Sequence, residues 1–145
     1  MNGYGAAGSA ERLARGIGPE GVPWDAPISP TNLYGASKAW GEALARVYST
    51  SYGMSCICVR LGGFQASAQV FDEQARQTQM HAVSPRDAAQ IFRLAIEAPR
   101  SVKFGIVPGI SEHVVSFQDN SHTKSLLGFA PMDGTAIATK ANPKL

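Results

Sequence analysis

Residues 30–38 read Pro30-Thr-Asn-Leu-Tyr-Gly-Ala-Ser-Lys38, and this stretch opens the longest helix that the sequence predicts. Tyr34 and Lys38 are four residues apart, so on a helix they share one face. Free tyrosine loses its phenolic proton near pH ~10, and a nearby ammonium group favours the phenolate. The pair could therefore act as a base. The spacing alone is equally consistent with two solvated side chains on an exposed helix face.

The surrounding pattern predicts a helix over residues 30–52 and a strand over residues 54–61. Ser29 is a plausible N-cap, Pro30 suits the first helical position, and Gly53 is a good terminator. Apolar side chains at three- and four-residue steps predict a buried face on this helix, made by Leu33, Ala36, Trp40, Ala43, Leu44 and Val47. Residues 54–61 form a continuous apolar run, which is typical of a strand buried on both faces of a parallel sheet.

Further along the chain, Ser84-Pro-Arg-Asp87 is a strong helix start, with serine as the cap and proline first. The helix that follows has an apolar face and is closed by Pro99; the face comprises Ala88, Ile91, Phe92, Ala95 and Ala98. Residues 102–107 are predicted as a strand and 119–127 as a short helix that ends at Gly128. Residues 1–29 are predicted as a loop region and 134–145 as a frayed tail. The fold class is α/β.

Composition narrows the possible functions. A chain of 145 residues, with 44% hydrophobic and 17% charged residues, fits a single domain spanning residues 1–145. A net charge of +2 without a basic block gives no reason to expect a nucleic-acid partner. The sequence has no apolar run of ~20 residues that would cross a membrane and no signal-peptide pattern at its start. We therefore expect a cytoplasmic protein without a membrane partner.

The cysteines and histidines do not suggest a metal site. Cys56 and Cys58 alternate within the predicted strand, so they share a face and are poorly placed for a disulfide. We interpret both as small buried apolar side chains rather than metal or redox groups. His81, His113 and His122 lack the spacing of metal ligands.

The segment from Pro30 to Leu61 resembles the active-site helix and following strand of the extended short-chain dehydrogenase/reductase superfamily, the NAD(P)-dependent sugar epimerases, dehydratases and dehydrogenases. The C-terminal half is similar to its uronate (hexuronate) dehydrogenase branch. Five segments carry this second resemblance: Arg60-Leu-Gly-Gly-Phe64, His81-Ala-Val-Ser-Pro-Arg-Asp-Ala-Ala-Gln90, Pro108-Gly-Ile-Ser111, Asp119-Asn-Ser121 and Leu127-Gly-Phe-Ala-Pro-Met-Asp133.

The resemblance implies roles for individual residues. Tyr34 would be the general base that takes a proton from the sugar C1 hydroxyl. Lys38 would hold the ribose hydroxyls of NAD or NADP and favour the phenolate. The backbone at Gly62 and Gly63 would run beside the nicotinamide ring of the cofactor. Two glycines that simply form a turn explain the sequence equally well. Arg76 would grip the carboxylate of a sugar-acid substrate, with a solvated surface arginine as the alternative. A complete member is expected to form a homodimer and to need no metal.

The chain also departs from the superfamily pattern. Superfamily members begin with a strand, a Gly-rich loop and a helix that takes the pyrophosphate, and the glycines of residues 2–8 follow no strand. The catalytic serine would fall before Met1, and Ser9 lies in a different motif context. The resemblance thus implies the C-terminal portion of a Rossmann-like, doubly wound parallel sheet without its N-terminal Gly-rich βαβ unit. The predicted strand 54–61 would then lack a neighbour and expose an apolar edge.

Three functions stay open on this basis. The first is an NAD(P)-dependent sugar oxidoreductase of the uronate dehydrogenase type. The second is a nucleotide-sugar epimerase or dehydratase. The third is a non-catalytic remnant or interaction module. The residue that distinguishes NAD from NADP follows the second strand of the complete fold, and that strand has no counterpart in this sequence.

Overall fold

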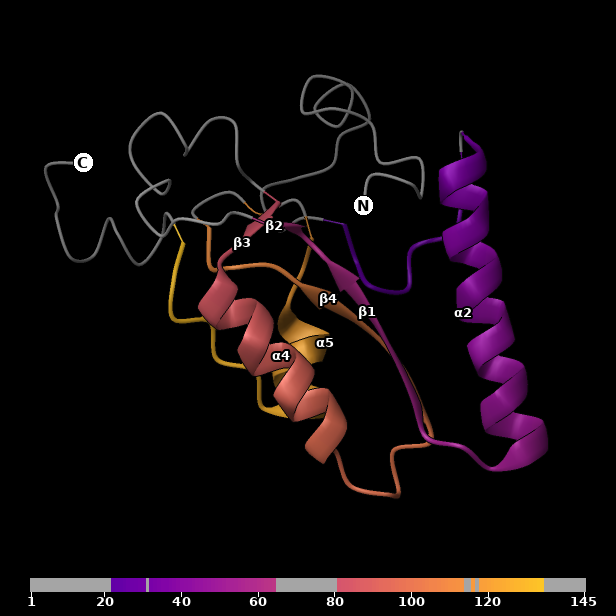
Figure 1. Ribbon diagram of the computed structural model, residues 1–145. Coiled ribbons are helices and arrows are strands. Elements are labelled where there is room, and N and C mark those ends of the chain that lie inside the picture. Colours follow the sequence, from indigo (N-terminus) through magenta and orange to yellow (C-terminus); the bar gives the residue numbers. More distant parts are fainter. Residues whose placement is uncertain (1–21, 31, 65–80, 114–115, 117, 135–145) are drawn as a thin grey trace, which may run out of the picture.

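The computed structural model describes residues 22–30, 32–64, 81–113, 116 and 118–134. Its central element is a parallel pair of strands, β1 (Cys56–Leu61) and β4 (Phe104–Gly109), paired from Cys56 opposite Phe104 to Leu61 opposite Gly109. Helix α2 (Leu33–Tyr52) covers one face of this pair, and helices α4 (Pro85–Glu97) and α5 (Ser121–Leu127) cover the other (Figure 1). The predicted α/β class is confirmed.

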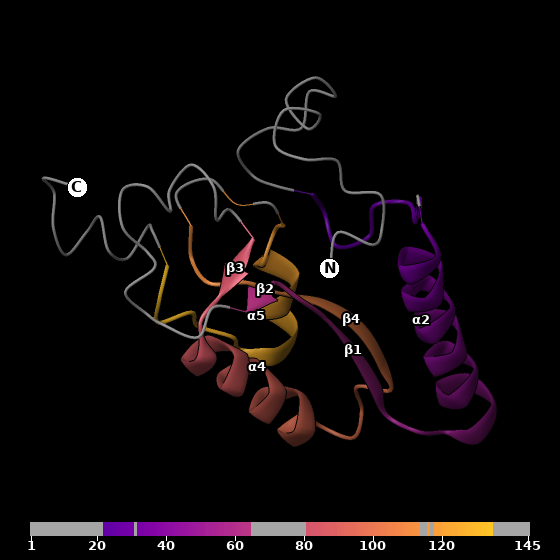
Figure 2. The same ribbon diagram turned by 45° about the horizontal axis from the view of Figure 1, so that its top comes forward.

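A second, shorter parallel pair lies beyond the carboxyl end of β1. Strand β2 (Gly63–Phe64) pairs with β3 (Ala82–Val83), and the two views agree on this position (Figures 1 and 2). The backbone N–H of Gly62 donates to the Gly109 carbonyl, and that of Gly63 donates to the His81 carbonyl, both at 2.7 Å. A Cβ atom on Gly62 would lie 2.2 Å from the His81 carbonyl oxygen. This close crossing of backbones therefore requires glycine at position 62.

Helix α2 ends where the sequence predicts but begins later. The predicted cap at Ser29 and start at Pro30 are wrong, because Asn32 caps the helix and Leu33 is its first residue. Asn32 Oδ1 accepts the Gly35 N–H at 2.8 Å, which satisfies one of the free donors of the first turn. At the other end Gly53 has φ 68°, and its N–H donates to the Tyr48 carbonyl. The left-handed backbone there favours glycine.

The predicted buried stripe on α2 is wrong in the described part of the chain. Leu33 is 89% exposed and Trp40 66% exposed, and Ala36, Ala43, Leu44 and Val47 are exposed as well. Gly35, Glu42 and Ser49 are the buried residues of this helix. The reason is that the face of β1 turned to α2 carries Arg60, which pairs with Glu42, so a polar contact takes the place of an apolar one.

The hydrophobic core lies on the opposite face, under α4 and α5. Ile91, Val107 and Phe129 form its buried centre. Partly buried apolar side chains surround them: Ile57, Val59, Leu61, Leu94, Leu126 and Leu127. Because side chains alternate along a strand, the odd-numbered residues of β1 contribute to this core, and Cys56, Cys58 and Arg60 face α2.

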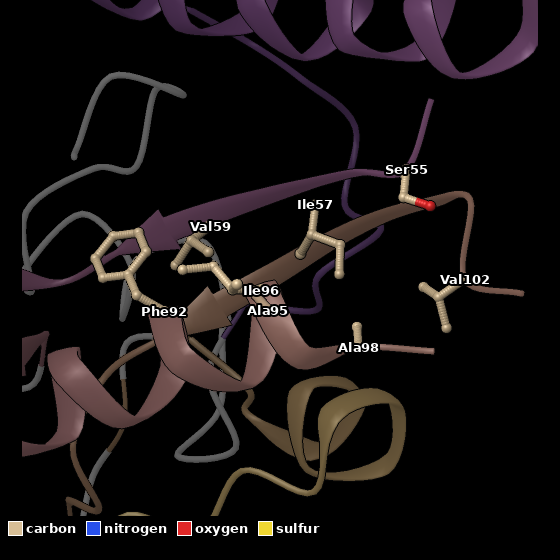
Figure 3. Close-up of a pocket in the computed structure, with 8 residues that line it drawn as sticks. All are labelled: Ser55, Ile57, Val59, Phe92, Ala95, Ile96, Ala98 and Val102. Atoms are coloured by element: carbon tan, nitrogen blue, oxygen red, sulfur yellow. The ribbon is translucent and has the colours of Figure 1, made fainter. Parts of the chain in front are cut away.

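The remaining elements follow their sequence signals with small shifts. Ser84 caps α4 by accepting the Asp87 N–H at 3.1 Å, and the helix closes before Pro99, as predicted. Phe92, on the predicted apolar face of this helix, is exposed, because it lies beside the edge of β1 that the described residues cover with no further strand or helix (Figure 3). Three boundaries differ from the predictions: β1 begins at Cys56, β4 occupies Phe104–Gly109, and α5 begins at Ser121. No helix among the described segments is long and apolar enough to cross a membrane.

Candidate active site

The first two turns of α2 present Tyr34 and Lys38 together. Lys38 Nζ lies 5.0 Å from the centroid of the Tyr34 ring, so the predicted sharing of one helix face is confirmed. Tyr34 is 54% exposed, which leaves the phenol accessible to a ligand. This end of α2 lies at the same end of the fold as the carboxyl ends of β1 and β4 (Figure 1), the edge where open α/β sheets bind ligands.

A buried ion pair one turn beyond Lys38 fixes α2 on the sheet. Arg60 Nε and Nη2 donate to the two carboxylate oxygens of Glu42 at 2.8 and 2.9 Å. Arg60 Nη1 also donates to the Trp24 carbonyl at 2.8 Å, which ties the segment before α2 to the same guanidinium. At the far end of the helix, Ser49 Oγ donates to the Lys103 carbonyl at 2.8 Å. These contacts set the rotation of α2 and hence the direction of Tyr34.

Sequence reasoning missed this pair, although a signal was present. Arg60 is the single charged residue in an otherwise apolar strand, and a buried charge needs a partner. Glu42 lies four residues beyond Lys38, within the helix that the sequence predicts. The Cys56 and Cys58 thiols on the same face are free and half-buried. Burial, with a further contribution from Glu42, raises the pKa of the Cys58 thiol, which disfavours the reactive thiolate.

His81 is a further residue at the carboxyl end of β1 that sequence reasoning did not select. A Cβ atom on Gly63 would lie 3.1 Å from His81 Cδ2 and Nε2, so the imidazole ring lies against this glycine. Burial lowers the pKa of His81 below 6.5, which favours the neutral ring. Backbone packing against His81 thus explains why position 62 is a glycine. The cofactor-binding roles of Gly62 and Gly63 stay predictions. Arg76 and Ser9 lie outside the described residues.

A buried carboxylate joins the start of α4 to the end of β4 and to residues 129–133. Asp87 accepts hydrogen bonds from Ser111 Oγ at 2.6 Å, the Met132 N–H at 2.7 Å and the Asp133 N–H at 3.1 Å. Ser84 Oγ donates to Asp133 Oδ2 at 2.7 Å. Burial alone would raise the pKa of Asp133, but hydrogen bonds from Arg86 and Ser84 hold it below its usual value. This network positions segments around β3 and β4, and its role is structural.

His113 is a second buried histidine near this network. Its Nε2 lies 2.9 Å from the Ala82 carbonyl, so the ring donates a hydrogen bond there in its Nε2–H form. Burial lowers the pKa of His113 below 6.5, as it does for His81. In the unfolded chain both imidazoles take up a proton as the pH falls through about 6.5, whereas in the folded chain they do so only at lower pH.

Acidification is therefore expected to destabilise the fold. Unfolding takes up protons in this window, so the free energy of unfolding falls as the pH is lowered from about 7.5 to about 5.5. Urea unfolding at a series of pH values measures the slope, and His113→Gln, which keeps a side-chain N–H donor, should reduce it. A free energy of unfolding that is constant or rises on acidification would contradict this expectation.

Comparison with known proteins gives relatives for most of the chain. No protein-family model matches it. It is 33% identical over 110 residues to the NAD-dependent glucose-6-phosphate dehydrogenase of Haloferax volcanii, a match that covers 76% of this chain and 40% of that protein. It is 31% identical over 109 residues to the uronate dehydrogenase of Agrobacterium fabrum, covering 75% of this chain and 38% of that protein.

A solved structure agrees with these matches. The crystal structure of uronate dehydrogenase from Agrobacterium tumefaciens, as a tyrosine-to-alanine mutant complexed with NAD, superposes with a TM-score of 0.65 at 26% identity. The superposition covers 86% of this chain and 44% of that chain. The chain therefore spans less than half the length of these relatives.

Proposed function

Because the chain belongs to the extended short-chain dehydrogenase/reductase superfamily, also called the NAD-dependent epimerase/dehydratase family, we propose that it provides the Tyr–Lys half of an NAD-dependent sugar dehydrogenase of the uronate dehydrogenase type. In this proposal it corresponds to the C-terminal portion of a doubly wound sheet. The Gly-rich βαβ unit that takes the pyrophosphate is absent from the described residues. The geometry of Tyr34 and Lys38 carries the proposal.

The two side chains fit the ribose end of the cofactor. Both lie on one exposed face at the first turns of α2, where a ligand can reach the phenol and the ammonium together. Lys38 would donate hydrogen bonds to the ribose hydroxyls, and the backbone at Gly63 would border the cofactor. Gly62 is a weaker candidate for contact with the cofactor. The space beside its Cα, where a Cβ atom would lie, is already filled by the His81 carbonyl and Ile110. Once bound, NAD supplies the hydride acceptor.

Tyr34 would act as the base in oxidation of the sugar. The phenolate takes the proton of the C1 hydroxyl, the C1–H bond gives up its hydrogen with the electron pair, and C1 becomes the carbonyl carbon of a lactone. The Lys38 ammonium lies over the Tyr34 ring, 5.0 Å from its centroid, on the same side of the helix as the base. The Glu42–Arg60 pair keeps α2 from turning, and so keeps the phenol directed to the substrate.

The substrate class and assembly are parts of the same proposal. A sugar acid fits the names of the uronate dehydrogenases to which the chain is similar, and Arg76 is the proposed carboxylate ligand, since a guanidinium binds a carboxylate in a bidentate manner. The exposed apolar side chains of α2, among them Leu33, Trp40 and Val47, support a homodimer through this helix. Free cysteines and a nicotinamide cofactor fit a cytoplasmic location.

A second candidate is a non-catalytic module that keeps the helices and binds no dinucleotide. The observation that favours it is that Tyr34, at 54% exposure, lies open on the surface of the described part of the chain. A nucleotide-sugar epimerase or dehydratase uses the same Tyr–Lys chemistry and is the alternative within the superfamily.

A hybrid enzyme tests the proposal. In this hybrid the matched region of the Agrobacterium uronate dehydrogenase is replaced by the present chain, so that the relative supplies the remainder of the fold. We expect NADH formation, followed by absorbance, with a hexuronate as substrate. A hybrid that folds and binds NAD but oxidises no hexuronate would contradict the dehydrogenase function and favour one of the other two candidates.

A further inference from the structure

The ring of His81 occupies the space into which a side chain at position 63 would extend. A Cβ atom on Gly63 would lie 3.1 Å from both Cδ2 and Nε2 of this imidazole. The Gly63 N–H also donates to the His81 carbonyl at 2.7 Å, which holds the two residues side by side. A larger residue at position 63 would have to push the ring aside, so glycine is what allows the imidazole to lie against the backbone here.

This imidazole lies at the end of the fold that carries the candidate active site. Gly63 begins β2, just beyond the carboxyl end of β1, and His81 directly precedes β3, which pairs with β2 (Figures 1 and 2). Open α/β sheets bind their ligands at this edge. The first turns of α2, with Tyr34 and Lys38, lie at the same end of the fold (Figure 1). The position of His81 therefore suits contact with a ligand of the Tyr–Lys pair.

The protonation state of His81 favours a hydroxyl as its ligand. The side chain is half-buried, and burial lowers the pKa of His81 below 6.5. At neutral pH one nitrogen of the uncharged ring donates a hydrogen bond and the other accepts one. A sugar hydroxyl also donates and accepts, so it can pair with either nitrogen. A carboxylate would favour the imidazolium, which burial disfavours.

We propose that His81 contacts the substrate and determines specificity, by a hydrogen bond between its ring and the C2 hydroxyl of the sugar. In the proposed reaction Tyr34 takes the C1 hydroxyl, and the backbone at Gly63 borders the nicotinamide that receives the hydride from C1. A ring packed against Gly63 then meets the substrate atoms next to C1. Of these, C2 carries a hydroxyl, whereas the ring oxygen only accepts. This inference rests on the proposed function, because it names a contact of the sugar that is oxidised.

Removing the contact from each side tests it. In the hybrid enzyme His81→Ala should raise the KM for a hexuronate at least about tenfold and leave the KM for NAD within about twofold. The 2-deoxy form of the same hexuronate should show a similar loss with the parent hybrid, because it lacks the hydroxyl. The two changes together should cost little more than either alone, since both delete one hydrogen bond. Losses that multiply would overturn the proposal.

His122→Ala is the matched control. His122 is also half-buried, but it stacks on the Trp24 ring with 4.0 Å between the centroids. Its replacement should leave the KM for the hexuronate within about twofold. His81→Gln keeps a donor and an acceptor, so it should retain more of the affinity than His81→Ala. Urea unfolding of each variant shows whether the fold is intact.

An exchange between positions 63 and 81 separates a hydrogen bond from packing. With His81 present, Gly63→Ser should raise the KM for the hexuronate, because the new side chain displaces the ring. In the His81→Ala background the same substitution should lower the KM, since a serine hydroxyl then enters the vacated space. Gly63→Ala in that background fills the space without a polar group and should not lower the KM. Equal recovery by alanine and serine would show that His81 only packs, and would overturn the proposal.

Imidazole spectra distinguish this contact from the reaction itself. With NADH in place of NAD, the hybrid can bind a hexuronate without turnover. The ¹⁵N resonances of His81, assigned by their loss in His81→Ala, should shift on binding, whereas those of His122 should not. Such a shift in a hybrid that oxidises no hexuronate supports the contact and overturns the dehydrogenase function. An active hybrid whose His81 resonances do not respond supports the function and overturns the contact.

Discussion

Replacing Tyr34 by phenylalanine in the hybrid enzyme is expected to lower kcat for hexuronate oxidation about 10²–10⁴-fold, the usual contribution of a positioned general base. The change removes one oxygen atom and keeps the aromatic ring. Lys38 Nζ contacts the face of that ring at 5.0 Å from its centroid, so this contact survives the substitution. The loss should therefore fall on the proton transfer, with little change in stability or in the KM for NAD.

The matched control is Tyr48→Phe. Tyr48 lies on the same helix and is similarly exposed, but it is more than three turns away from Tyr34 and contacts the Tyr52 ring instead. Its kcat should stay within about twofold of the parent. Lys38→Met should raise the KM for NAD as well as lower kcat, because Lys38 is proposed to hold the ribose. A Tyr34→Phe enzyme with nearly the parent rate would contradict the assignment of the base.

Replacing Asp87 by alanine is expected to destabilise the chain by several kcal/mol, at about 1–3 kcal/mol for each buried donor that loses its acceptor. Asp87 is fully buried and accepts three hydrogen bonds, from Ser111 Oγ and from the N–H groups of Met132 and Asp133. Its removal leaves these donors without a partner and also opens a cavity at the start of α4. Met132 and Asp133 lose their backbone hydrogen bonds to this carboxylate, whereas the contacts of Gln90 with Ala130 and of Arg86 with Asp133 remain.

Urea or thermal unfolding measures this change, with Asp25→Ala as control. Asp25 is exposed, so its replacement should alter the free energy of unfolding by less than about 0.5 kcal/mol. Asp87→Asn keeps the shape but turns one acceptor into a donor, so an intermediate loss is expected. The double variant Asp87→Ala/Ser111→Ala should lose less than the sum of the single variants, since the two groups share one hydrogen bond. An Asp87→Ala variant as stable as the parent would exclude this account.

Local sequence signals predicted the parts of the fold that depend on neighbours within one or two turns. Ser84 caps α4, and Gly53 and Gly128 end α2 and α5 in left-handed conformations. Each of these signals acts over three to six residues, so the sequence alone contains all the groups involved. Tyr34 and Lys38 belong to the same class, because a spacing of four places them on one face of any helix.

The prediction that Ser29 caps α2 was wrong for a reason that is also local. Ser29-Pro30 and Asn32 compete as the start of the helix, and both have the required side chains. The extended backbone at Asn32 and its hydrogen bond to the Gly35 N–H decide between them. The family resemblance was confirmed by the relatives. The apolar run of residues 54–61 correctly predicted a strand in a parallel sheet.

By itself, then, the sequence determined the order of α2, β1, α4, β4 and α5, the Tyr–Lys pair and the superfamily, but it did not predict the short strands β2 and β3. The tertiary structure alone decided which face of α2 is buried and that Glu42 meets Arg60 across 18 positions of the chain. It also decided that, among the described residues, β1 pairs with β4 alone and has an apolar groove beside its other edge (Figure 3). The physical reason is that an apolar stripe in a sequence shows only that burying those side chains would be favourable in free energy. Which surface it meets, or whether any surface reaches it, depends on contacts between segments far apart in the chain.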